Sequence, residues 1–186
     1  NNSCELNLVV VNKDNLIPKS YNSNLVNYKN IKINSIAQND LDNMINDAAK
    51  EGLKIYPSSG YRSVARQTTL FNNQVSRCKK QGYKSSNAEL MAATVVARPG
   101  TSEHHTGLAI DFNGVKDDFY KTKEYSWLMS NAANYGFILR YPQNKTDVTN
   151  VIYEPWHFRY VGKVHAQKVV QSGLCLEEYI DSIMKK

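Results

Sequence analysis

The sequence predicts a single α+β domain in which a small, mainly antiparallel central sheet is flanked by helices. Three observations support this fold class. The 186 residues suit one domain that is large enough to bury a core. Short strand-like segments cluster in the middle of the chain, and segments with helical periodicity lie on both sides of them. A hydrophobic content of 41% with 22% charged residues is ordinary for a soluble globular protein.

The first third of the chain is predicted to hold two strands and one helix. Residues 5–12 alternate and then become apolar, as in a strand, and residues 13–34 are expected to form an irregular segment. A helix is predicted over 36–51, followed by a short strand over 53–56 and a turn over 57–60. The apolar residues expected on the buried face of this helix are Ile36, Leu41, Met44, Ile45 and Ala48.

Two more helices are predicted before the next strand. Ser63 can cap a helix that runs to about residue 80, and a capping-box pattern starts a second helix over 87–96. Residues 107–112 alternate as a strand. The remaining elements are expected as a helix over 123–135, strands over 137–140, 151–153 and 157–160, and terminal helices over 163–172 and 176–185.

Charge and hydropathy narrow the classes of partner. A net charge of +6 favours an anionic partner, such as cell wall, nucleic acid or acidic lipid. No apolar run reaches the roughly eighteen residues that a membrane span needs, and no aromatic and basic pattern typical of nucleic-acid binding is present. We therefore expect no membrane span in this chain and no nucleic-acid partner. Because the chain opens without methionine or a signal-like apolar region, we interpret it as a mature or trimmed fragment, from which any upstream anchor or export segment is absent.

The three cysteines are Cys4, Cys78 and Cys175, and they are widely spaced. This spacing excludes a dense disulfide framework and a cysteine-rich structural zinc site. We expect all three thiols to be free, with a pairing of Cys4 left open.

Two short segments contain the residues of a candidate catalytic metal site. His104 and Asp111 lie seven residues apart, in a loop and the strand after it, and His157 lies on a distant strand. Two imidazoles and a carboxylate are a common ligand set for catalytic Zn²⁺, which keeps its fourth position for water. Glu154 precedes His157 by three residues and is a spare carboxylate that can take a proton from that water. The pattern predicts a metallohydrolase whose zinc site is carried by the central sheet.

Two details bear on this site. On a regular strand, Glu154 and His157 would point to opposite faces because they are an odd number of residues apart. Pro155 breaks this regularity, so we expect both side chains to converge on one metal. His105 and His165 are expected to be ordinary core or surface residues and not ligands.

Longer motifs surround these residues. The segment Ser102-x-His104-x-x-Gly107-x-Ala109-x-Asp111, followed by Glu154-Pro-Trp-His157, resembles the signature of the zinc D-Ala-D-Ala peptidases. This family contains VanY-type carboxypeptidases, VanX dipeptidases and bifunctional VanXY enzymes. Ser59-Gly-Tyr-Arg-Ser63 with Gln67 resembles its substrate-binding arginine segment, and residues 135–142 and 158–162 resemble its core strands. The resemblance extends over nearly the whole chain.

The resemblance implies a role for each site residue. The Zn²⁺ ligands would be His104, Asp111 and His157, and Glu154 would be the catalytic base. Arg62 would stabilise the oxyanion, and Ser102 and Gln67 would contact the peptide.

It also implies a substrate. Residues 1–186 would form one zinc peptidase domain that removes the last D-Ala from peptidoglycan precursors ending in D-Ala-D-Ala. The alternatives are an L,D-carboxypeptidase acting on tetrapeptides, a bifunctional D,D-dipeptidase and carboxypeptidase, and a cell-wall binding module without activity. We expect a monomer that acts outside the cytoplasm, anchored to the membrane or associated with the wall, or in the cytoplasm if it is VanXY-like. Vancomycin resistance and ordinary wall remodelling are both compatible roles.

Overall fold

A four-stranded antiparallel sheet forms the centre of the fold, as predicted. The computed structural model describes residues 7–185. The strand order is β3-β4-β6-β5, and each neighbouring pair is antiparallel. The strands are β3 (Pro57–Ser59), β4 (Ala109–Phe112), β5 (Phe137–Leu139) and β6 (His157–Tyr160).

The two faces of this sheet differ in chemistry, because successive side chains of a strand point to opposite sides. Ile110 and Phe158 lie in the main hydrophobic core on one face. Asp111 and His157 alternate with them and therefore project from the other face. These two residues are also direct cross-strand partners in the β4–β6 register. The alternation predicted for residues 107–112 thus places two candidate ligands side by side.

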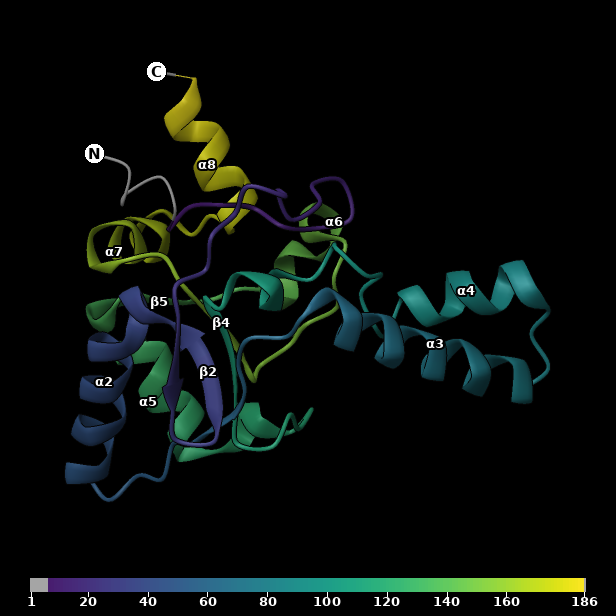
Figure 1. The fold of residues 1–186 in the computed structure, drawn as a ribbon. Coiled ribbons are helices and arrows are strands. Elements are labelled where there is room, and N and C mark those ends of the chain that lie inside the picture. Colours follow the sequence, from purple (N-terminus) through teal and green to yellow (C-terminus); the bar gives the residue numbers. More distant parts are fainter. Residues whose placement is uncertain (1–6, 186) are drawn as a thin grey trace.

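Helices cover the sheet. The main core joins the apolar face of the sheet to α2 (Gln38–Lys50) and α5 (Lys123–Asn131), which lie next to each other in Figure 1. A second apolar cluster joins β5 to α7 (Lys163–Ser172) and α8 (Leu176–Met184). The shorter helices are η1 (Ser35–Ala37), η2 (Glu103–Thr106), η3 (Phe119–Lys121), η4 (Ala132–Tyr135), η5 (Gln143–Lys145) and α6 (Thr146–Thr149).

The face predicted for α2 is confirmed with one exception. Leu41, Met44, Ile45 and Ala48 are buried, whereas Ile36 is 40% exposed. The exception arises because residues 35–37 form the 3-10 turn η1 and not the first turn of the helix. The angular position of Ile36 therefore does not follow the periodicity of an α-helix.

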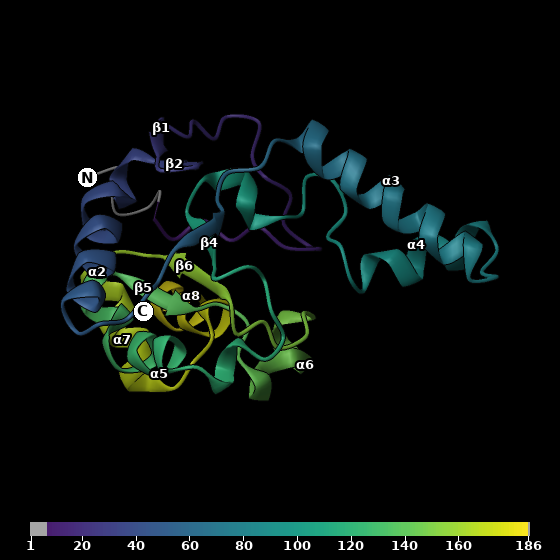
Figure 2. The ribbon, with the colours of Figure 1, turned by 90° about the horizontal axis from the view of Figure 1, so that it is seen from below.

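A helical hairpin projects from the body of the molecule in Figures 1 and 2. Its helices are α3 (Val64–Lys80) and α4 (Ser85–Ala93), and they share a small apolar cluster of their own. Ser63 caps α3 as predicted, because its Oγ accepts a hydrogen bond from the backbone nitrogen of Arg66 at 3.0 Å. The capping box predicted for α4 does not form: its N-cap is Lys84, without a side-chain hydrogen bond.

Three predictions of local structure, in the N-terminal third and before β6, are wrong. Residues 13–34, expected to be irregular, contain a hairpin of β1 (Leu25–Tyr28) and β2 (Ile31–Asn34). Residues 53–56 form no strand, and the pairing begins instead at Pro57. Proline is tolerated there because β3 is an edge strand and Pro57 is its first residue. Residues 151–153 also form no strand.

The predicted N-terminal strand is absent for a visible reason. Residues 7–12 pair with no strand of either sheet, and residues 5–6 lie outside the described part of the chain. The carbonyl oxygens of Asn7 and Val9 instead accept hydrogen bonds from Nη2 of Arg159, at 2.9 and 2.7 Å. A buried guanidinium group thus takes the place of a neighbouring strand.

The prediction of free thiols is confirmed for the two cysteines that lie in the described part of the chain. Cys78 and Cys175 are buried and free, and Cys4 lies outside the described residues. Within residues 7–185, no helix is both long and apolar enough to span a membrane.

Gly107 fixes the approach of the β1–β2 hairpin to the loop before β4. Its φ is +72°, and a Cβ placed there would lie 2.7 Å from the backbone nitrogen of Asn34. The same nitrogen donates a hydrogen bond to the carbonyl oxygen of Gly107 at 2.8 Å. A side chain at this position would therefore separate the hairpin from the loop.

We expect Gly107→Ala to lower the free energy of unfolding by about 2–4 kcal/mol, because backbone strain and a steric clash add. Gly52→Ala is the matched control: Gly52 also has positive φ, +78°, but nothing lies within 4 Å of its added Cβ. This control should cost only about 1 kcal/mol. Urea denaturation of both variants measures the difference, and equal losses would contradict the clash.

Candidate metal centre and active site

Three buried side chains converge on one point of the polar face of the sheet. His104 lies in η2, Asp111 in β4 and His157 at the start of β6. Nε2 of His104 lies 3.3 Å from Oδ2 of Asp111, and Nδ1 of His157 lies 3.3 Å from Oδ1 of the same carboxylate. One ligand atom from each residue lies within 4.8 Å of the others. The structure therefore brings together the three predicted ligands.

Hydrogen bonds on the far side of each imidazole select its tautomer. Nδ1 of His104 lies 2.8 Å from the carbonyl oxygen of Gly60, which can only accept, so Nδ1 carries the proton. Nε2 of His157 lies 2.8 Å from Oε1 of Glu103 and donates to it in the same way. The other nitrogen of each ring, Nε2 of His104 and Nδ1 of His157, therefore faces Asp111 and is the one that can bind a metal ion. This is the arrangement that metal-binding histidines require.

The Asp111 carboxylate has a buried oxygen that lacks a hydrogen-bond donor among the described residues and that a cation could contact. Its Oδ1 is buried and accepts no hydrogen bond within the described chain. Burial alone would raise the pKa of Asp111, but His104 and His157 outweigh this effect and hold the pKa well below its usual value. A buried carboxylate oxygen without a hydrogen-bond donor, in a carboxylate that lies beside two imidazole nitrogens, fits a bound divalent metal ion.

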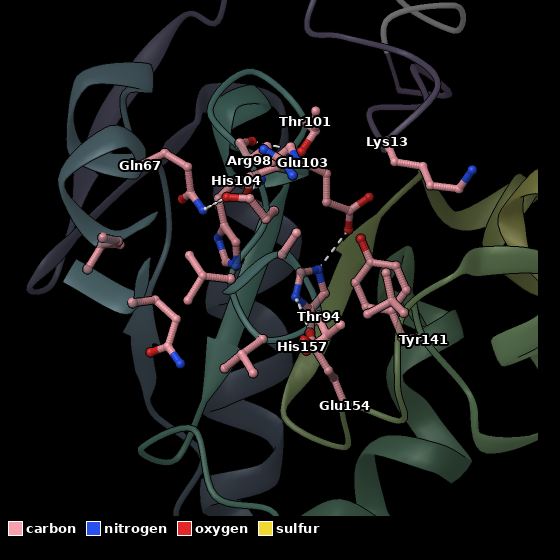
Figure 3. Close-up of a pocket in the computed structure, with 18 of the residues that line it drawn as sticks. Lys13, Gln67, Thr94, Arg98, Thr101, Glu103, His104, Tyr141, Glu154 and His157 are labelled. Carbon is pink, nitrogen blue, oxygen red and sulfur yellow. Dashed lines mark hydrogen bonds and ion pairs between the residues drawn. The ribbon is translucent and has the colours of Figure 1, made fainter. Parts of the chain in front are cut away.

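Glu103 is the functional residue that sequence reasoning missed. Its Oε1 accepts from His157, and its Oε2 accepts from Arg140 Nε at 2.8 Å and from Arg159 Nη1 at 3.1 Å (Figure 3 shows its contact with His157). The side chains of Glu103 and of both arginines are fully buried. Burial would raise the pKa of Glu103, but the two guanidinium groups outweigh it and keep the pKa well below its usual range. Glu103 therefore stays ionised and orients His157.

The signal for Glu103 was present but ambiguous. Glu103 immediately precedes the ligand His104 in the sequence. The motif around it already contained a complete set of metal ligands, so this further acidic residue did not stand out. Its partners Arg140 and Arg159 lie 37 and 56 residues further along the chain. Only the folded sheet brings their charges to one carboxylate.

His157 lies between three carboxylates. Burial alone would lower its pKa, but Asp111, Glu103 and Glu154 outweigh burial and raise the pKa well above its usual value. The centre of this cluster therefore favours positive charge, which a bound metal ion would provide.

Glu154 reaches the metal group from a turn. The backbone nitrogen of His157 donates to the carbonyl oxygen of Glu154 at 3.2 Å, so the chain folds back at Pro155 before β6 begins. Oε2 of Glu154 then lies 3.2 Å from Nδ1 of His157 (Figure 3). The structure brings the two side chains together, and their convergence on one metal stays a prediction. Unlike the ligands, the Glu154 side chain keeps 20% exposure and can contact water.

Arg62 is held beside the metal group by neutral partners. Its Nη1 donates to Gln67 Oε1 at 2.9 Å, and its Nη2 donates to Ser59 Oγ at 3.2 Å. Ser59 pairs with Asp111 in the β3–β4 register, so Arg62 is anchored next to a ligand. Burial lowers the pKa of Arg62, an effect that the charge of Asp111 partly offsets. None of its side-chain hydrogen bonds neutralises its charge, which remains available to an anion.

The other two predicted site residues are engaged locally. Gln67 is buried, and its Nε2 donates to the carbonyl oxygen of Ala97 at 2.7 Å while its Oε1 holds Arg62. Ser102 is the N-cap of η2, and its Oγ accepts from the backbone nitrogen of His104 at 3.3 Å. Both line the same cavity as the metal group. Their contact with a peptide stays a prediction.

His105 is not part of the metal group. Its Nδ1 donates to the carbonyl oxygen of Arg62 at 2.7 Å, and its Nε2 accepts from the backbone nitrogen of Gly100 at 3.1 Å. Both ring nitrogens are therefore used in joining the arginine segment to the loop before η2. His165 also lies away from the site, with Nδ1 2.6 Å from the hydroxyl of Tyr179.

These groups share a cavity of about 520 Å³ (Figure 3). The metal group, Arg62, Glu154 and Ser102 all line it, and it continues along the α3–α4 hairpin. A metal site, a carboxylate and an unneutralised arginine around one cavity can activate water and stabilise negative charge on a bound carbonyl group.

Comparison with known proteins agrees with this chemistry. Residues 30–163 match the model of the VanY family, which is described as D-alanyl-D-alanine carboxypeptidase. The chain belongs to the VanY family. This match confirms the resemblance found in the sequence motifs.

Individual VanY relatives cover most of the chain. A D-alanyl-D-alanine carboxypeptidase of Enterococcus faecalis is 40% identical over 181 residues, which are 96% of this chain and 67% of that protein. The structure of VanYB in complex with D-alanine-D-alanine is 40% identical, with a TM-score of 0.85, and the match covers 94% of this chain and 97% of that one. A mutant of the vancomycin resistance D,D-pentapeptidase VanY from a VanB-type cassette, in complex with Zn(II), is 40% identical. Its TM-score is 0.84, with 94% and 99% covered.

These comparisons confirm the α+β fold and the class of enzyme. The chain is a zinc metallopeptidase of the VanY family, and His104, Asp111 and His157 are the group that can hold the ion.

We expect Glu103→Gln to weaken zinc binding by about 10–100-fold, because a neutral amide orients His157 less strongly than a carboxylate. The change also leaves Arg140 and Arg159 short of a counter-charge, so stability will fall. Competition with a chelator, at a temperature well below unfolding, measures the zinc affinity.

Glu177→Gln is the control for this loss of stability. Glu177 accepts from both terminal nitrogens of Arg140, at 2.8 and 2.6 Å, but makes no contact with His157. It should destabilise the fold and leave zinc affinity unchanged within about twofold. If both variants lose zinc equally, the effect belongs to folding and not to the orientation of His157.

Proposed function

We propose that this protein is a zinc-dependent D,D-carboxypeptidase that removes the C-terminal D-Ala from peptidoglycan precursor peptides ending in D-Ala-D-Ala. The observation that carries the proposal is the joint placement of Glu154 and Arg62 in the cavity of the metal group. The family match and the relative that binds D-alanine-D-alanine support the choice of substrate.

The metal and the base divide the activation of water between them. When bound, zinc acts as a Lewis acid that makes water acidic enough to attack a carbonyl group near neutral pH. Glu154 then accepts the proton of the attacking water, and it can later deliver a proton to the departing amine. Its position supports this role, because Oε2 lies 3.2 Å from the ligand atom Nδ1 of His157 and the side chain remains partly exposed.

Arg62 stabilises the negative charge that develops on the carbonyl oxygen. Its guanidinium group is held by Gln67 and Ser59, so little reorganisation is needed when this charge appears. A preorganised donor of this kind is worth about 10²–10³ in rate. In this scheme Gln67 acts through Arg62, and its contribution is to fix the orientation of that cation.

The C-terminal end of the substrate is directed toward the closed part of the cavity. Ser102 is 6% exposed and lies two residues before His104, so we place the terminal carboxylate of the peptide near its hydroxyl. The remaining stem peptide leaves through the open part of the cavity.

We propose that residues 1–186 are one catalytic domain and that the protein works as a monomer outside the cytoplasm, associated with the membrane or the wall. Its net charge of +6 supports this location, since it favours contact with an anionic envelope.

The experiment that tests the proposed function is incubation of the zinc-loaded protein with three substrates, followed by mass detection of products. They are a muramyl pentapeptide ending in D-Ala-D-Ala, a muramyl tetrapeptide and free D-Ala-D-Ala. We expect D-Ala release from the pentapeptide, and a chelator should abolish it. Cleavage of the tetrapeptide alone would make the protein an L,D-carboxypeptidase. No chelator-sensitive release from any substrate would overturn the proposal of an enzyme.

We expect Glu154→Gln to keep its zinc and lose at least about 10³ in kcat, because the amide cannot accept the proton of the attacking water. Metal analysis and urea unfolding should match the wild-type protein, since Glu154 is not one of the three ligands. Normal turnover in this variant would refute the assignment of the base.

A further inference from the structure

Val115 occupies an unfavourable backbone conformation beside the active-site cavity. Asn113, Gly114 and Val115 follow one another with φ values of +56°, +87° and +56°. Asparagine and glycine tolerate this left-handed region, but a β-branched residue is rarely found there because its side chain collides with the backbone. Among the three, only Val115 is strained by its own chemistry.

Hydrogen bonds from Asn113 and Gly114 stabilise this conformation of the loop. Asn113 exchanges hydrogen bonds with the chain before β3: its backbone nitrogen donates to Tyr56 O at 3.0 Å, and its Oδ1 accepts from Tyr56 N at 3.0 Å. Its Nδ2 donates to Lys54 O at 2.9 Å, and the nitrogen of Gly114 donates to Ser58 Oγ at 2.7 Å. Four hydrogen bonds thus fix the two residues that precede Val115 and determine where its side chain lies.

Packing in the core does not explain the valine. Val115 is 47% exposed and belongs to none of the apolar clusters formed by the described residues. It does line the cavity that contains the metal group, Arg62 and Glu154. An exposed apolar side chain that is held under strain at a binding cavity points to a contact with a ligand, since strain is retained where function requires it.

The position of Val115 indicates which part of a ligand it meets. The three metal ligands are at most 5% exposed, whereas Val115 is 47% exposed and therefore lies at the open edge of the cavity. A carboxypeptidase encloses the C-terminal end of its substrate, and the residues before the cleaved bond lead out to solvent. An apolar wall at this edge suits an aliphatic side chain.

We propose that Val115 is a specificity-determining residue that packs against the aliphatic side chain of the residue preceding the D-Ala-D-Ala pair. This inference rests on the proposed function, because it needs a substrate whose cleaved bond lies at the metal group. It adds a selection for the upstream residue, which none of the metal ligands, Glu154 or Arg62 can provide.

The test combines a stability measurement with two substrates of different length. Val115→Asn replaces the valine by a residue that accepts left-handed φ, so Tm should rise by roughly 2–4 °C. For diacetyl-L-Lys-D-Ala-D-Ala, kcat/KM should fall about tenfold, mainly through KM, because one apolar contact is lost. For acetyl-D-Ala-D-Ala, which lacks the upstream side chain, kcat/KM should stay within about twofold of the wild-type value.

Two further variants separate strain from contact. Lys29→Asn is the matched control, since Lys29 also has a left-handed φ, +51°, but does not line the metal cavity. It should raise Tm without changing the preference between the two substrates. Val115→Leu keeps an apolar side chain and should keep the preference without the gain in Tm.

The outcomes are distinguishable from a failure of the proposed function. If the wild-type protein releases D-Ala from neither substrate, the enzyme assignment fails. If it cleaves both and Val115→Asn keeps the wild-type preference for the lysine substrate, the role of Val115 fails. A fall in Tm for Val115→Asn would equally overturn the inference, because the valine would then stabilise the loop.

Discussion

The buried carboxylate of Glu103, held between Arg140 and Arg159, is the interaction on which the rest of the site depends. Its two oxygens contact one imidazole and two guanidinium groups, at 2.8 to 3.1 Å. Burying any one of these charges alone would be very unfavourable, but each guanidinium group offsets the cost for the carboxylate. Ligand orientation and charge compensation are therefore properties of one cluster.

This cluster also joins segments that are far apart in the chain. Arg140 also donates two hydrogen bonds to Glu177 at the start of α8. Arg159 also donates to the carbonyl oxygens of Asn7 and Val9. The first described residues and the last helix are thus connected to the metal ligand His157. The hydrogen bonds that orient His157 are thus part of a network that reaches both ends of the described chain.

The three arginines in and around the site differ in the charge of their partners. Arg62 donates to neutral hydrogen-bond acceptors, whereas Arg140 and Arg159 both form ion pairs with Glu103. A guanidinium group without an ionic partner stabilises negative charge on a substrate more strongly than one already neutralised. The three arginines therefore differ in their partners and not in their burial alone. These contacts support the role proposed for Arg62.

The sequence by itself determined the fold class, most helices, the strands of the sheet centre and the three ligands. These features depend on local periodicity, capping and motif spacing, which a linear pattern contains. The tertiary structure decided the position of β3, the β1–β2 hairpin and the exposure of Ile36, because pairing partners and a 3-10 turn override local preference. It also decided the role of Glu103, whose partners come from β6 and from the residue directly after β5. Charge compensation depends on distance in space, and no spacing along the chain records it.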